Sequence, residues 1–331
     1  ESVLWMGRAY ESLGDAPAAI DALAHLIIVA SSDVRRQEAQ DGLSRVLKQQ
    51  IHTFYERKAW VTLLKFHGDH QQAFHMVPLE RERVLMVAHA YQQVNLPSEA
   101  LHWYDQLLQE YPDSTLREDI LVQKVLLAEE MGKGLLVQEV GTAYLREFPD
   151  GRWRGQVETA LGMESLTRQQ YAKAIHHFSE AIQQVDGIVE QRHVLRNRAR
   201  AHRALGQMEA AVQDLRQMVS DPPVQIADVI RLGDAVFDQG EYAEAEGLYD
   251  QVLVSEAPVA LKAWAKYRLA VSLDHMGKHG EAQKLLAEIR QLETSSPELE
   301  HTIRSAATAV LDEMSLKEKP PARTINEPTE S

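Results

Sequence analysis

The sequence contains no cysteine, few aromatic residues and no long apolar run, and it has no excess of positive charge. Without cysteine there can be no disulfide, no thiolate-bound metal and no cysteine nucleophile. A membrane-spanning helix needs about 20 apolar residues, far more than the short run from Leu26 to Ala30, so we expect no direct membrane insertion. The formal net charge of −14 argues against binding to nucleic acid, which requires a basic surface.

The composition is that of a folded, helical protein. Apolar residues make up 44% and charged residues 25% of the 331 positions, which excludes wholesale disorder. Alanine, leucine, glutamine, glutamate and arginine are plentiful and aromatics reach only 6%, which favours helices over sheet. The chain begins at Glu1 and enters a helical pattern at once. We therefore expect it to be part of a longer protein, with any signal peptide lying upstream.

Residues typical of turns recur with a period near 37. They are Asn95, Gly132, Gln169, Gly206, Gly240 and Gly277, with Gly14 as an earlier turn of the same kind. The successive spacings from Asn95 onward are 37, 37, 37, 34 and 37 residues. A repeat of this length indicates an array of similar structural units.

Side-chain size also repeats around each turn. Small or short residues stand five positions after it, at Ala19, Ala100, Val137, Ala174, Ala211, Ala245 and Ala282. Others stand seven positions before it, at Gly7, Ala88, Val125, Gly162, Ala199, Gly233 and Ala270. Larger apolar residues stand nine positions after it, at Leu23, Tyr104, Phe178, Leu215, Tyr249 and Leu286, although Gly141 breaks this rule. Small residues let two antiparallel helices approach closely, and we expect the larger ones to fill the gap to the next pair.

Each unit is therefore predicted to be a helix, a short turn, a second helix and a loop. A glycine at the turn ends the first helix in left-handed conformation, and prolines such as Pro112 and Pro149 end second helices. This pattern resembles the tetratricopeptide repeat family. The best match consists of Leu232-Gly233, Gly240-Glu241-Tyr242, Ala245, Tyr249 and Pro258. The resemblance implies an all-α fold, a right-handed superhelical solenoid of antiparallel helix pairs.

Four segments are expected. Residues 1–82 should form N-terminal repeats with an irregular hairpin, in which a long helix from Val34 to Tyr55 is followed by a turn at Gly68-Asp69. Residues 83–296 should form a regular array of about six repeats. Residues 297–316 should form a capping helix, which terminal units of such arrays need, and residues 317–331 a flexible tail.

No residue pattern indicates catalysis or a bound metal or cofactor. The sequence lacks the GxSxG, GxxxxGK[ST] and GxGxxG motifs, so we predict no catalytic residues, no cofactor and no enzyme activity. The densest histidine group is His67, His70 and His75 with Asp69. The expected turn at Gly68 separates its members, so these are interpreted as surface histidines without a metal.

One first helix is basic within this acidic chain, from Gln191 to Arg203. In the family, the concave groove lined by first helices holds peptides. Positions spaced three or four apart share one helix face, and the resemblance places a peptide-binding surface at His193, Arg196, Asn197, Arg200, Arg203, Arg231, Trp264, Tyr267 and Arg268. Arginine binds carboxylates with paired hydrogen bonds, so the expected ligand is an acidic peptide or a terminal carboxylate. The alternative is a solvated face paired with Glu190, Asp214 and Asp234 of the chain itself.

A second candidate surface surrounds Trp60, Phe66, Phe74 and Met76, although core filling of a distorted hairpin is favoured there. The leading function is a protein–protein interaction scaffold, and the alternative is a structural or oligomerisation module that self-associates. Loops at Tyr111 to Ser114 and Phe148 to Gly151 are similar to those of bacterial cell-envelope repeat proteins. This favours a periplasmic location, with the cytoplasm as the alternative.

Overall fold

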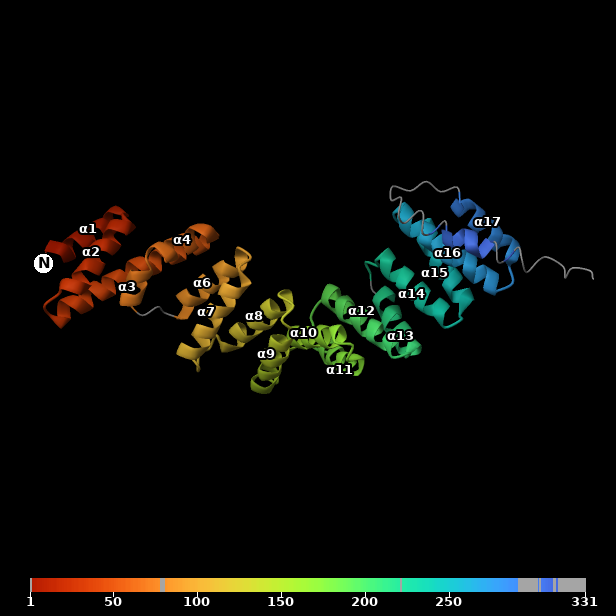
Figure 1. Cartoon of the computed structure of the whole chain (residues 1–331), viewed down its shortest axis with the longest axis horizontal. Coiled ribbons are helices and arrows are strands. Elements are labelled where there is room, and N and C mark those ends of the chain that lie inside the picture. The colour runs from red at the N-terminus through yellow and green to blue at the C-terminus, as the bar shows by residue number, and fades with distance from the viewer. Residues whose placement is uncertain are drawn as a thin grey trace, which may run out of the picture. The chain divides into compact units, whose positions relative to one another are not determined.

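The computed structural model describes residues 2–77, 81–220, 222–290, 303, 305–311 and 314 (Figure 1). Within these residues the regular structure consists of helices, and no strand is present. The chain divides into two compact units, residues 1–160 and 161–331. Helix α10 (Arg154–Thr167) crosses the boundary between them.

The first unit is a series of helices that pack against their neighbours in the sequence. Its helices are α1 (Ser2–Leu13), α2 (Ala16–Val29), α3 (Asp33–Glu56), α4 (Trp60–Asp69), α5 (Gln71–Met76), α6 (Arg81–Gln93), α7 (Pro97–Glu110), α8 (Arg117–Glu130) and α9 (Gly134–Glu147). Helices α1 and α2, α6 and α7, and α8 and α9 pack as pairs. The fold is thus an all-α array of helix hairpins, as the repeat pattern predicts.

The second unit continues the same arrangement. Its helices are α11 (Tyr171–Ile182), α12 (Ile188–Ala204), α13 (Met208–Ser220), α14 (Ile226–Asp238), α15 (Tyr242–Val254), α16 (Val259–His275) and α17 (His279–Arg290). The pairs are α12 with α13, α14 with α15, and α16 with α17. Of the expected capping helix, residues 303, 305–311 and 314 are helical. Its other positions, like the expected tail 317–331, lie outside the described residues.

The predicted turn residues end the first helix of each pair in left-handed backbone conformation. Positive φ angles between 60° and 84° occur at Gly14, Asn95, Gly132, Gln169, Gly206, Gly240 and Gly277. At the α14–α15 turn the amide of Gly240 donates to the Phe237 carbonyl (2.8 Å) and that of Glu241 to the Val236 carbonyl (3.2 Å). These bonds satisfy carbonyls that the ending helix leaves open. These seven predicted turns are confirmed.

The small and large positions of the repeat form the core of each pair. The position five after the turn is at most 1% exposed in all seven predicted copies. The larger residue nine after the turn packs on the small residue of its own pair: a Cβ on Gly7, Gly162 or Gly233 would lie within 3 Å of Leu23, Phe178 or Tyr249. Leu23 also lies close to Gly42 of the following helix α3. These residues therefore join the two helices of a pair as well as neighbouring pairs.

The prediction of a turn at Gly68-Asp69 was wrong. The long helix is present as α3, but its turn comes at Lys58, where φ is +52°. Lys58 lies 37 residues before Asn95, so the repeat period extends to this point although no glycine or asparagine marks it. Gly68 is helical within α4, and the second helix is interrupted only at His70, where α5 follows.

The aromatic residues of this region fill the core. Phe74 is buried, and Trp60, Phe66 and Met76 pack half-buried against the cluster formed by α2, α3 and α6. The interpretation of core filling is thus supported over an exposed aromatic surface. His67, expected on the surface, is 5% exposed and belongs to the same interior.

Candidate peptide-binding groove

Helix α12 carries its apolar and its basic residues on different faces. Val194, Leu195, Ala199 and Ala201 are buried against the neighbouring helices. Positions spaced by three and four residues on another face carry the basic residues His193, Arg196, Arg200 and Arg203. Arg200 and Arg203 are exposed, while Arg196 is partly exposed.

Two arginines of this surface are held by one buried carboxylate. Arg196 Nη2 donates to both oxygens of Asp228, at 3.0 and 3.3 Å. Arg231, one turn further along α14, donates to Oδ1 of the same carboxylate at 2.5 Å. Asp228 is buried, whereas the side chains of Arg196 and Arg231 are 32% and 44% exposed. The buried acid therefore fixes two cations without covering them.

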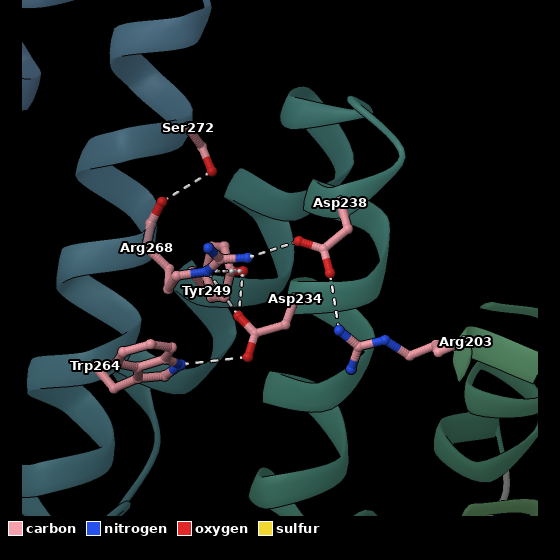
Figure 2. A network of polar contacts seen from close by, with 7 residues as sticks. All are labelled: Arg203, Asp234, Asp238, Tyr249, Trp264, Arg268 and Ser272. Carbon is pink, nitrogen blue, oxygen red and sulfur yellow. Dashed lines mark hydrogen bonds and ion pairs between the residues drawn. The ribbon is translucent and has the colours of Figure 1, made fainter. Parts of the chain in front are cut away.

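A second network joins α12, α14, α15 and α16 (Figure 2). Asp238 accepts from Arg203 (2.9 Å) and from Arg268 (3.4 Å). Asp234 accepts from Arg268 Nε (2.8 Å), from the Tyr249 hydroxyl (2.7 Å) and from the Trp264 indole (3.3 Å).

Arg268 is the most enclosed cation of this network. Its side chain is 16% exposed, and its guanidinium lies 4.0 Å from the centre of the Phe237 ring. Burial, together with the neighbouring Asp234 carboxylate, raises the pKa of the Tyr249 hydroxyl, which therefore stays protonated and donates. Arg268 and its partners thus link α14, α15 and α16.

A pocket of about 710 Å³ lies between α12, α13 and α14, inside the second unit. Its polar lining consists of Arg196, Asn197, Arg200, Arg203, Arg231 and Asp238. Its apolar lining consists of Ala199, Ala204, Met208 and Leu215. The lining thus combines small and apolar residues with four guanidinium groups.

Arg200 differs from the other arginines of this pocket. Among the described residues no carboxylate or other group forms an ion pair or hydrogen bond with its guanidinium, whereas Arg196, Arg203 and Arg231 each have a carboxylate partner. The pocket is therefore lined by four guanidinium groups, of which three are paired with the two carboxylates Asp228 and Asp238. The local balance is positive although the whole chain is strongly negative.

The structure separates the nine predicted binding residues into two groups. Arg196, Asn197, Arg200, Arg203 and Arg231 line the pocket. The remaining four lie beside it or further along the array: His193, Trp264, Tyr267 and Arg268. The Asn197 amide donates to the His193 carbonyl (2.9 Å), so its hydrogen-bonding capacity is partly used within α12.

His193 is not a cationic member of the surface. Partial burial, and secondarily the nearby Arg196 guanidinium, lowers the pKa of its ring below the ordinary value. The ring is therefore uncharged at neutral pH. Trp264 and Tyr267 lie 5.8 Å apart between ring centres on α16, and the Trp264 indole is bound to Asp234.

Two acidic residues of the site, Asp228 and Asp238, were not predicted from the sequence. They share a face of α14 with Arg231 and Asp234, at spacings of three and four that match those of the basic residues on α12. Comparing the same face in successive repeats would have identified them. Of the expected acidic partners, Asp234 takes part in the network, whereas Asp214 pairs with Arg198 instead.

The described residues contain no group of three or more histidine, aspartate or glutamate side chains placed to hold a metal ion. Nor does any helix in the described part of the chain combine the length and the apolar character that crossing a bilayer requires.

The fold and its repeated packing define an all-α solenoid of helix hairpins. Residues 159–224 and 230–297 match the sequence profile of the tetratricopeptide repeat family. These two segments of the chain are therefore tetratricopeptide repeats. Repeats of this family support a general function as a protein-interaction scaffold, and the family is typically non-catalytic.

Solved structures with the same fold share little sequence with this chain. A tetratricopeptide repeat protein from Parabacteroides merdae is 15% identical, with a TM-score of 0.50, over 80% of this chain and 99% of that one. The C-terminal part of a repeat-containing protein from Cytophaga hutchinsonii is 16% identical, with a TM-score of 0.53, over 62% of this chain and 78% of that one. No curated protein is significantly similar in sequence. At these identities the likeness concerns the fold alone.

Proposed function

We propose that this chain binds an acidic segment of a partner protein in the pocket between α12, α13 and α14. The observation that carries the proposal is the surplus of guanidinium groups around an open cavity of about 710 Å³, with Arg200 unpaired among the described residues. A function in binding, and not in catalysis, agrees with the absence of catalytic motifs from the sequence.

The arginines suit this ligand because of how they are held. Asp228 fixes the guanidinium groups of Arg196 and Arg231, so little freedom is lost when a ligand carboxylate joins them. Arg200 follows Arg196 by one turn on α12 and offers paired donors to one incoming carboxylate. Ala199, Ala204 and Leu215 provide apolar contacts for the peptide's own apolar groups.

The positions with structural partners are poor choices for testing this idea. Reversing the charge of Arg196 would place a carboxylate against the buried Asp228 and destabilise the fold. Arg200→Gln removes one charge and breaks no described ion pair. The matched control is Arg216→Gln on α13, which removes one charge from a half-exposed side chain paired with Glu244, outside the pocket lining.

The experiment measures binding of fluorescein-labelled peptides by anisotropy. One decapeptide contains alternating glutamate and leucine, and its counterpart has glutamine in place of every glutamate. We expect the acidic peptide to bind more tightly, with Arg200→Gln weakening it about tenfold, as for the loss of one charge-assisted interaction. Arg216→Gln should bind like the parent. Equal binding of the two peptides, or equal losses in the two variants, would refute the proposal.

Self-association and a location in a bacterial cell envelope remain predictions. The loops at Tyr111 to Ser114 and Phe148 to Gly151 support the location in a cell envelope. Sedimentation velocity of the parent chain over a range of concentrations tests self-association, since a self-assembling module would sediment faster as the protein concentration rises.

A further inference from the structure

A second pocket, of about 440 Å³, lies in the first unit between α4, α5 and α7. Aromatic and histidine side chains contribute much of its wall. They are His67, Phe74, His75, His102, Trp103 and Tyr111. The other lining residues are Gln71, Val77, Gln106 and Glu110. This pocket is distinct from the arginine-lined pocket, which belongs to the second unit.

His67 stands at a repeat position that other helix pairs fill with a large apolar or tyrosine residue. It is the ninth residue after the turn at Lys58, as Tyr104 and Phe178 are the ninth after theirs. Its ring centre lies 4.8 Å from that of Phe74 and 5.0 Å from that of Trp103. The sequence has thus placed a polar ring at a core position.

Within the described part of the chain, Nδ1 of the His67 imidazole has no hydrogen-bond partner. His67 is 5% exposed, and this nitrogen is buried. Burial, with His75 nearby, lowers the pKa of His67 to about 4. At neutral pH the ring is therefore uncharged, with one donor and one acceptor nitrogen. Buried polar groups are nearly always hydrogen-bonded. Because His67 also lines the pocket, its ring has hydrogen-bonding capacity left for a bound ligand.

The charges of the pocket indicate what that partner is. Among its described lining residues Glu110 is the one carboxylate, and there is no lysine or arginine. An anionic ligand would therefore meet no fixed cation here, in contrast to the arginine-lined pocket. The aromatic wall favours a ring in edge-to-face contact, and the neutral imidazole favours an uncharged hydroxyl.

We propose that this pocket binds a tyrosine side chain of a partner protein, with its ring against Phe74 and Trp103 and its hydroxyl hydrogen-bonded to His67. The site is independent of the arginine-lined pocket, so either can fail without the other. It would give the scaffold a second contact of different chemistry, which raises affinity for a partner that reaches both sites.

The test uses p-cresol, which is the side chain of tyrosine, and toluene, which is that of phenylalanine. Both are titrated into the full chain labelled with ¹⁵N-histidine, and the ring nitrogen resonances are followed by NMR. We expect p-cresol to shift the His67 resonances in a saturable way and to bind at least about fivefold more tightly than toluene, the gain from one net hydrogen bond.

His67→Phe assigns the resonances and tests the role of the imidazole. In this variant the ratio of p-cresol to toluene affinity, followed through the His102 resonances, should fall to about one. His176→Gln, an exposed histidine in the second unit, is the control and should leave the ratio unchanged. Equal affinity of the two probes for the parent chain would mean that the pocket is merely apolar. If neither probe caused a saturable shift, the pocket would not be a binding site. Either result with the parent chain alone would overturn the proposal.

Discussion

Single glycines decide how closely two helices of a pair approach. At Gly233 a Cβ would lie 2.9 Å from Cε1 and 3.2 Å from Cζ of the Tyr249 ring. The hydroxyl of that ring is bound to Asp234 and accepts from Arg268, so it cannot move without disturbing the network between α14 and α16. The glycine is therefore needed for space and not for backbone freedom, since Gly233 lies within helix α14.

Gly233→Ala should lower the free energy of unfolding by about 1–3 kcal/mol, as overpacking of a filled core does. The control is Gly247→Ala in α15, where a Cβ would have no neighbour within 4 Å. There alanine should raise stability by about 0.5–1 kcal/mol, because it is the better helix former. Urea unfolding followed by circular dichroism measures both. Equal stability of the two variants would show that Tyr249 yields to the added methyl group.

The turns show how far residue identity alone predicts structure. Glycine or asparagine at most turns made the period visible, and Gln169 followed from the spacing. Lys58 also has a positive φ, although a lysine rarely adopts this left-handed backbone conformation. Residue type gave no signal there, whereas extending the 37-residue spacing by one step would have found it. The interval from Gly14 to Lys58 is longer because α3 has 24 residues, and this hid the continuity.

At the scale of the helix, periodicity predicted which residues share a face but not which partners they meet. The basic face of α12 is present as expected, and five of the nine predicted residues line one pocket. Pairing depends on the next repeat: Asp228 and Asp238 come from α14, more than 30 residues away in sequence. A single helix carries no information on such partners. The placement of Arg268 on the Phe237 ring likewise depends on how α14 and α16 pack.

Helix α4 should respond to acid through His67. Its pKa of about 4 in the folded state lies below that of the unfolded chain, about 6.5. Between these values the unfolded chain binds more protons, so stability falls as pH is lowered through this window. From pH 7.5 to pH 5 the loss should be about 2 kcal/mol.

Hydrogen exchange of the α4 amides at both pH values measures this loss locally. His67→Phe has no group that titrates at this position, so its pH dependence should be smaller by the same amount. A parent chain and variant that lose protection in parallel between pH 7.5 and pH 5 would mean that His67 gains its proton without opening α4.

For the whole molecule, the charge of the chain and the charge of the arginine-lined pocket have opposite signs. The chain carries a formal charge of −14, while the pocket has four guanidinium groups, three of them paired with two carboxylates. An approaching acidic peptide is repelled at long range by the net charge of the chain and attracted at short range by the charge of the arginine-lined pocket. Salt screens the two differently, because the Debye length falls from about 30 Å at 0.01 M to about 10 Å at 0.1 M.

The association rate of the acidic decapeptide should therefore rise several-fold as salt increases over this range, because repulsion acts mainly during approach. The dissociation rate should also rise, because the contacts with Arg200 and its neighbours weaken. Stopped-flow anisotropy separates the two rates. Arg200→Gln should speed dissociation and change association little, since it alters one contact and adds only one unit to a large negative charge. An association rate of the parent chain that falls as salt increases would contradict this expectation. It would mean that the arginines of α12 and α14 dominate the electrostatic potential that an incoming peptide meets, and that the acidic residues elsewhere lie too far from this pocket to repel it.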